Sequence, residues 1–229
     1  MHCWNTYRFA MSDENGQNTR LYLDLPVIDV VIRAIVESRD FLAELWRIHR
    51  RAESGKVGSH QITFRVYTTK EEAKRINQEI AGNPLLKKLT DGGWLNSFNW
   101  EEESKNELDL LTDRNGTSDK KNWPVPFQDC WPDFAMGFSK SLLGLLKSIR
   151  ESKGKSVKAI GLLPGDEIIA IYEHIDKDIA DLWRVHGAGT FLHQAHAVFG
   201  YPKFEAFLAN STNQGQTSIN CIHSPKHLK

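Results

Sequence analysis

The sequence predicts an α/β fold of the α+β type. Long helices are expected to pack against a small mixed sheet with β-α-β units, and the C-terminal part is expected to be helical. Residues 60–68 alternate apolar and polar side chains, which is the pattern of a half-buried strand. A helix is expected from residue 69 to about Ala81, and residues 94–100 predict a second strand. Apolar residues at helical spacing predict two further helices, over residues 134–150 and 162–184.

The helix expected between residue 69 and Ala81 has clear start and stop signals. Thr69 is expected to be its N-cap, with the carboxylate of Glu72 reaching back to the Thr69 amide in a capping box. The run Gly82-Asn83-Pro84 is expected to end it. This β-α-β order is the firmest part of the predicted organisation.

The N-terminal third is expected to contain a short strand at residues 20–25. After Pro26, which the first turn of a helix tolerates, residues 27–51 predict one long amphipathic helix with a break near residues 38–40. Glycine and serine predict a flexible loop at residues 53–59, and the polar residues 101–123 predict a long surface loop.

The domain organisation expected from the sequence is one α/β domain over residues 1–209 followed by a flexible polar tail at 210–229. Residues 190–199 and 203–209 are expected to form the last helices of that domain. A chain of 229 residues can bury a sizeable core without disulfides or metals.

Composition and charge exclude several functional classes. Lys and Arg number 29, as do Asp and Glu, and this balance argues against a duplex nucleic-acid binder and a polybasic membrane anchor. No run approaches the ~18 apolar residues of a membrane span, and no signal-peptide core is visible, so we expect a cytoplasmic protein. The spacing of Cys3, Cys130 and Cys221 favours neither disulfides nor a zinc site. No phosphate-binding glycine motif is present, and we expect no cofactor.

The densest group of chemically versatile side chains is the histidine group at the C-terminal end, His186, His193 and His196. His193 and His196 are three residues apart, so they would lie on one face of the expected helix. Such a pair can act as general acid and base, hold an anion or bind a metal, although the zinc motif His-Glu-x-x-His is absent. The alternative is a structural role, in which these histidines cap a helix and pack beside Trp183 and Phe199. No metal site is predicted.

The strand at residues 60–68 supplies two further candidates, Arg65 and His60. Arg65 and Thr63 should point to one face of the strand and His60 to the other. A strand arginine can hold a carboxylate through two parallel hydrogen bonds, whereas the alternative for Arg65 is a solvated strand face.

Aromatic residues add a third kind of candidate. The chain has seven tryptophans, and Trp100 and Trp131, with Trp94 and Trp123, could line a groove for a peptide or flat ligand. A role in the hydrophobic core is the alternative.

Taken in order, these segments resemble the C-terminal domain of lantibiotic dehydratases, also described as the thiopeptide-type biosynthesis domain. The counterparts are residues 4–9, 27–51, 58–67 and 191–201. The resemblance implies a role in modifying peptides by eliminating glutamylated serine and threonine.

The chain also departs from that family's pattern. The family's strand carries a histidine and two arginines, and only Arg65 fits this pattern. Thr63 stands in place of the other arginine, and His60 is one position out of register. His193 fits the terminal motif, but Ala197 and Val198 replace its Asn-Arg. The family's Glu and Arg-Tyr-Gly-Gly segment is absent.

The sequence therefore predicts a peptide-binding or peptide-modifying accessory protein of natural-product biosynthesis. If the protein is an enzyme, His193 would be the general acid and base, with His196 beside it, and Arg65 would hold a carboxylate. His60, His186, Trp100 and Trp131 would contact a peptide or small-molecule ligand. The alternatives are a non-enzymatic interaction or assembly protein, including a homodimer, and a histidine-based small-molecule or metal-binding protein.

Overall fold

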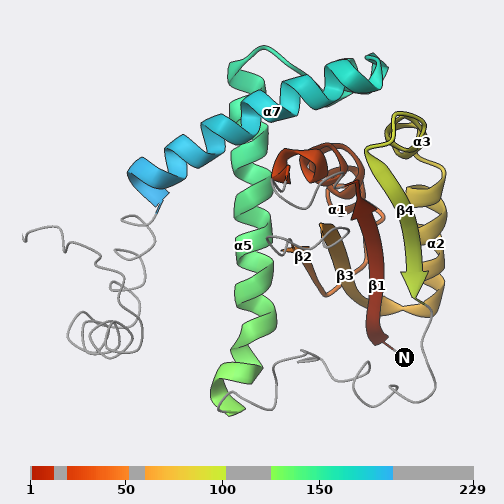
Figure 1. Cartoon of the computed structure of the whole chain (residues 1–229). Coiled ribbons are helices and arrows are strands. Elements are labelled where there is room, and N and C mark those ends of the chain that lie inside the picture. The colour runs from red at the N-terminus through yellow and green to blue at the C-terminus, as the bar shows by residue number, and fades with distance from the viewer. Residues whose placement is uncertain (1, 13–19, 52–59, 102–124, 188–229) are drawn as a thin grey trace, which may run out of the picture. The chain divides into compact units, whose positions relative to one another are not determined.

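The computed structural model describes residues 2–12, 20–51, 60–101 and 125–187, and every structural statement below concerns these ranges. The chain divides into two compact units, residues 1–179 and 180–229. Figure 1 shows the helices and strands of the described ranges.

A four-stranded sheet forms the centre of the first unit. Its strands are hydrogen-bonded in the order β2-β3-β1-β4, and each of the three pairs is antiparallel. The strands are β1 (His2–Met11), β2 (Leu45–Arg51), β3 (Gln61–Thr69) and β4 (Leu95–Glu101).

Helical segments lie in two of the connections between these strands. The 3-10 helix η1 (Leu21–Asp24), the π-helix η2 (Val27–Ile32) and the short helix α1 (Arg33–Val36) join β1 to β2. The helices α2 (Lys70–Ala81) and α3 (Pro84–Asp91) join β3 to β4. Each connection links two strands that run in the same direction with a third strand between them, which is the split β-α-β arrangement.

The residues described after the sheet, 125–187, form four helical segments: α5 (Val125–Ser152), α6 (Val157–Leu162), α7 (Gly165–Leu182) and the π-helix η4 (Trp183–Gly187). Helix α5 packs against the edge strand β2. The amide of Ile48 on β2 donates to the Ser139 hydroxyl of α5, at 2.9 Å. A helix over an edge strand blocks pairing with a foreign strand.

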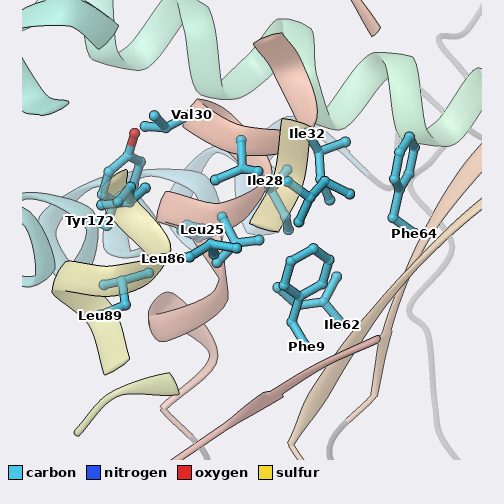
Figure 2. Packing of buried hydrophobic residues seen from close by; sticks show 14 of the residues in the cluster. Phe9, Leu25, Ile28, Val30, Ile32, Ile62, Phe64, Leu86, Leu89 and Tyr172 are labelled. Carbon is cyan, nitrogen blue, oxygen red and sulfur yellow. The ribbon is translucent and has the colours of Figure 1, made fainter. Parts of the chain in front are cut away.

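The hydrophobic core lies between one face of the sheet and the helical layer, and Figure 2 shows Phe9 and Ile62 of the strands with Leu25 and Ile28 of the helices. Burying these side chains supplies the main favourable free energy of folding. The sheet contributes Tyr7, Phe9, Met11, Ile62, Phe64 and Val66, and the helices contribute Leu25, Ile28, Ile32, Ile76, Leu86, Leu89, Leu146 and Tyr172.

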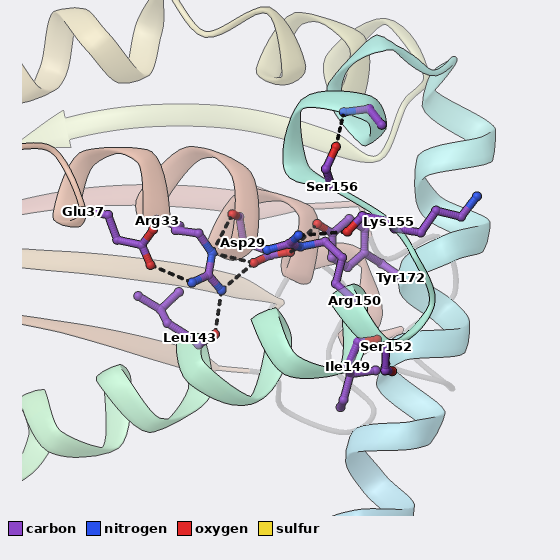
Figure 3. Close-up of polar contacts among 11 residues, drawn as sticks. Asp29, Arg33, Glu37, Leu143, Ile149, Arg150, Ser152, Lys155, Ser156 and Tyr172 are labelled. Carbon is purple, nitrogen blue, oxygen red and sulfur yellow. Dashed lines mark hydrogen bonds and ion pairs between the residues drawn. The ribbon is translucent and has the colours of Figure 1, made fainter.

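A buried polar network joins η2 to α5 and α7, and Asp29 is its centre (Figure 3). One carboxylate oxygen of Asp29 accepts from Nε of Arg33 at 2.7 Å. The other accepts from Nε of Arg150 at 2.7 Å and from the Tyr172 hydroxyl at 2.8 Å. Burial and the charge of Asp29 raise the pKa of Tyr172 above its usual range. We call Asp29, Arg33, Arg150 and Tyr172 the Asp29 network.

The prediction of a mixed α and β fold is confirmed, and so is the β-α-β order from β3 to β4. Thr69 caps α2, its hydroxyl accepting from the Glu72 amide at 3.3 Å. The Glu72 carboxylate binds the guanidinium of Arg75, with contacts of 2.7 and 2.8 Å. The expected mixed sheet is antiparallel at every described pair, because β1 lies between the two parallel strands β3 and β4.

Two predictions for the N-terminal third are wrong. Residues 20–25 form no strand: Leu23, Asp24 and Leu25 are all buried, and three consecutive buried residues fit the turn of η1 better than one face of a strand. The expected helix over residues 27–51 ends at Val36, and residues 45–51 form β2. The predicted break at residues 38–40 does fall in a turn.

The helices predicted at residues 134–150 and 162–184 are confirmed as parts of α5 and α7 with η4. Several predicted segments lie outside the described residues: the loop at 53–59, residues 102–123 of the second loop, the helices after residue 189 and the tail at 210–229. No helix in the described ranges combines the length and apolar character needed to cross a bilayer.

Candidate functional site

The face of the sheet opposite the core carries a group of arginines. We call it the outer face: Trp4, Thr6 and Arg8 of β1, Arg47, His49 and Arg51 of β2, Thr63, Arg65 and Tyr67 of β3, and Asn99 and Glu101 of β4. These residues alternate with the core residues of the same strands, because successive side chains of a strand point to opposite faces. The arginine patch is Arg8, Arg47, Arg51 and Arg65.

The strand register brings the arginines together. Arg47 on β2 lies directly opposite Arg65 on β3, in the same row as Thr6 and Glu101. The next row holds His49, Thr63 and Arg8. Side chains directly opposite each other on an antiparallel pair are about 4.5–5.5 Å apart at Cβ, and like charges in that arrangement repel.

Trp4 forms the floor under two of these arginines. The guanidinium carbon of Arg47 lies 5.5 Å from the centre of the indole ring, and that of Arg65 lies 5.3 Å from it. These distances are those of cation–π contacts, which hold a guanidinium in place over an aromatic ring. Because Trp4 is only 2% exposed, its ring supports the arginines and offers no open face to a ligand.

The electrostatic environment of Arg65 disfavours its positive charge. Burial, followed by the positive charges of Arg47 and Arg8, lowers the pKa of Arg65 to about 10. Glu101 acts in the opposite direction, and Arg51 adds a further small repulsion. Arg65 stays protonated at neutral pH, but it is a cation whose charge a nearby anion would stabilise.

Arg8 shows how a carboxylate is bound on this face. Its Nε and Nη2 donate to the two carboxylate oxygens of Glu101, at 2.6 and 3.1 Å. This is the two-pronged geometry that makes arginine the usual ligand for carboxylates. Both side chains are substantially exposed, so this pair lies at the solvent side of the patch.

His60 does not belong to the arginine patch. It is fully buried immediately before β3, on the core side, where its Nε2 lies 3.2 Å from a carboxylate oxygen of Asp24. The prediction that His60 and Arg65 point to opposite faces is therefore confirmed.

The other predicted ligand residues belong to other elements than β3, which carries Arg65. Trp100 lies on the core side of β4, stacked on Tyr7 with ring centres 6.4 Å apart, and is joined to the core. Trp131 is on α5, 5.7 Å from the Phe134 ring. His186 belongs to η4 in the second unit, and His193 and His196 lie outside the described residues.

Arg65 is a candidate residue of the sequence analysis, whereas its neighbours Arg8, Arg47 and Trp4 are not. Arg8 and Trp4 alternate along residues 2–11 with the buried Cys3, Tyr7 and Phe9, so the strand period was visible there. Arg47 was assigned to a helix, and its pairing with Arg65 depends on strand register, which this short segment does not reveal.

An open pocket of about 540 Å³ is lined in part by Lys88, Trp94, Leu162 and Asp166. The ammonium of Lys88 is bound to the carbonyls of Gly161 and Leu163, at 2.8 and 2.9 Å, so it serves to hold α6. Within the described ranges, no three His, Cys, Asp or Glu side chains are grouped to hold a metal ion.

No family model, no curated protein and no solved structure matches this chain. The resemblance to the lantibiotic dehydratase domain therefore stays a prediction.

Proposed function

We propose that this chain is a peptide-binding protein whose outer face holds an acidic, extended segment of its partner. The observation that carries the proposal is the pairing of Arg47 with Arg65 across two strands, with both guanidinium groups over Trp4. The pair is held in a fixed position before any ligand arrives, which lowers the entropy lost on binding.

An anion is the ligand class that this arrangement favours. Two guanidinium groups in the same row repel each other, and that repulsion contributes to the lowered pKa of Arg65. A carboxylate of the partner that reaches Arg47 and Arg65 would add charge-assisted contacts to both guanidinium groups and offset part of their mutual repulsion. Each such hydrogen bond contributes about 1.5–3 kcal/mol.

A peptide fits this face better than a nucleic acid. Single-stranded nucleic acids bind sheet faces by stacking bases on open aromatic rings, whereas the Trp4 ring is covered by Arg47 and Arg65. The chain also has no net surplus of positive charge. The Arg8–Glu101 contact provides an intramolecular example of carboxylate binding on the same face.

The spacing of the patch suggests how acidic residues are arranged in the partner. Arg65 and Arg8 lie in successive rows of the sheet, which are two residues apart along a strand. That interval is about 6.6–6.8 Å, which is also the distance between alternate side chains of an extended peptide. A segment with Glu or Asp at every second position, aligned with the strands, would match both rows.

A binding titration tests this proposal. A fluorescein-labelled peptide with alternating Glu and Ser is titrated with the full chain and followed by fluorescence anisotropy. The variant carrying Arg47→Gln and Arg65→Gln should weaken binding by about 10- to 100-fold, as expected for lost charge-assisted hydrogen bonds. The matched control Arg184→Gln, whose side chain is 74% exposed and pairs with Asp181, should bind as the unaltered chain does.

Two results would contradict the proposal. The first is equal affinity of the double variant and the unaltered chain for the acidic peptide. The second is tighter binding of a single-stranded oligonucleotide than of the peptide, with the same dependence on Arg47 and Arg65, which would assign the face to nucleic acid. His193 and His196, for which a catalytic role is predicted, lie outside the described ranges.

A further inference from the structure

Helix α5 has one face in the core and another that is exposed. Ser139 and Leu143 are buried, and they fix which side of the helix faces the sheet and α1. The Ser139 hydroxyl accepts from the Ile48 amide of β2, and the Leu143 carbonyl accepts from Nη2 of Arg33 at 2.6 Å. Because each residue of a helix is rotated by about 100° from the one before, Gly137 lies on a side that points away from both Ser139 and Leu143.

Two large aromatic side chains are exposed next to Gly137. Phe134 is 39% exposed and Phe138 is 42% exposed. Their rings meet edge to face, with centres 4.8 Å apart, and Trp131 continues the row at 5.7 Å from Phe134. Single exposed apolar residues are ordinary on a protein surface, whereas adjoining ones indicate a surface that another molecule covers.

A pair of opposite charges lies on the other side of Gly137. Asp133 and Lys140 are exposed and seven residues apart, which places them along one side of the helix. No atom of the described residues lies within 4 Å of the position that a Cβ would occupy on Gly137. A glycine in a helix interior is unfavourable, but its missing side chain lets a second backbone approach closely. We call Asp133, Phe134, Gly137, Phe138 and Lys140 the Gly137 face.

We propose that the Gly137 face binds a second copy of this chain, with the two α5 helices antiparallel about a two-fold axis at Gly137. In such a dimer the same surface is used by both copies, so it has to be complementary to itself. Phe134 of one copy approaches Phe138 of the other on one side of the axis. On the other side, Asp133 of one copy approaches Lys140 of the other. This dimer leaves the arginine patch on the sheet unused.

The distribution of charge is what favours a second copy in this orientation. Asp133 lies four residues before Gly137 and Lys140 three residues after it, so a two-fold axis at the glycine brings opposite charges together. A parallel pair of helices would place Asp133 beside Asp133 and Lys140 beside Lys140, and like charges repel. The two-fold axis also forms each contact twice.

Sedimentation velocity of the full chain over a dilution series tests the dimer. The unaltered chain should sediment with twice the mass of one chain and dissociate on dilution. Asp133→Lys should weaken the dimer by about tenfold or more, because two attractive contacts become repulsive. Lys140→Asp should do the same. The double variant Asp133→Lys with Lys140→Asp should recover most of the affinity, since the pairs are then restored with their charges exchanged.

Glu151 provides the matched control for charge. It is exposed on the same helix, but an axis at Gly137 places it beyond the residues of α5 in the other copy. Glu151→Lys should therefore dimerise as the unaltered chain does. Glu151→Lys combined with Lys140→Asp restores the net charge but not the pair, and it should stay as weak as Lys140→Asp alone.

Gly137→Lys tests the position of the axis. The new side chain points into open space in the single chain, so circular dichroism should show an unchanged fold, whereas two lysines on the axis should abolish the dimer. The proposal is refuted if the unaltered chain has the mass of one chain at every concentration. It is also refuted if Gly137→Lys dimerises as before, or if exchanging the charges of Asp133 and Lys140 recovers no affinity.

Discussion

Replacing Asp29 by asparagine is expected to lower the free energy of unfolding by about 3–5 kcal/mol, because it leaves two buried arginines without their shared counter-ion. Arg33, Arg150 and Tyr172 all donate to this one carboxylate, and the side chains of Asp29 and the two arginines are 0–6% exposed. Urea denaturation followed by circular dichroism measures the change.

An exposed ion pair provides the control for Asp29. Asp91 binds Lys87 at 2.8 Å with both side chains more than half exposed, and Asp91→Asn should cost less than about 1 kcal/mol. The double variant Asp29→Asn with Arg150→Leu should recover part of the loss, because one unpaired charge is then removed. An Asp29→Asn variant as stable as Asp91→Asn would show that the Asp29 network does not hold the helices together.

The second large effect is expected in the core. Leu89→Ala on α3 should lower the free energy of unfolding by about 2–5 kcal/mol, since it removes buried methyl groups and leaves a cavity. Leu89 is completely buried beside Leu86 and other core residues (Figure 2). The same denaturation experiment measures this loss.

Leu162 offers the matched comparison, because the same substitution is made at a side chain that is 76% exposed. Leu162→Ala should change stability by less than about 0.5 kcal/mol. Equal losses in the two variants would contradict the placement of α3 in the core.

The parts of the fold that could be predicted are those with a local signal. The alternation around Phe64 and the Thr69 cap are read from neighbouring residues, and both are confirmed. The hydrophobic pattern of residues 45–51 fits both a helix and a strand. Leu45 and Ile48 have helical spacing, whereas Trp46 and Ile48 alternate with Arg47 as in a strand. Pairing with β3 decides between them, and that partner is distant in the sequence.

The candidate site was harder to predict for the same reason. The clear strand pattern around Arg65 makes it a candidate, but an arginine becomes part of a patch only through its neighbours across the sheet. Arg47 and Arg8 lie 18 and 57 positions from it in the chain and reach it through strand register. Likewise, the pairing of Asp24 with His60 depends on η1, a segment that was expected to be a strand.

The central claim, that the arginine patch binds acidic peptide, is tested most directly by the arginine Nε–H signals in a ¹H–¹⁵N NMR titration of the full chain. Adding the alternating Glu-Ser peptide should shift the signals of Arg8, Arg47 and Arg65 saturably. The signals of Arg33 and Arg150, whose Nε groups are bound to Asp29, should not move. A saturable shift of signals elsewhere in the chain, with those of the patch unchanged, would contradict the claim.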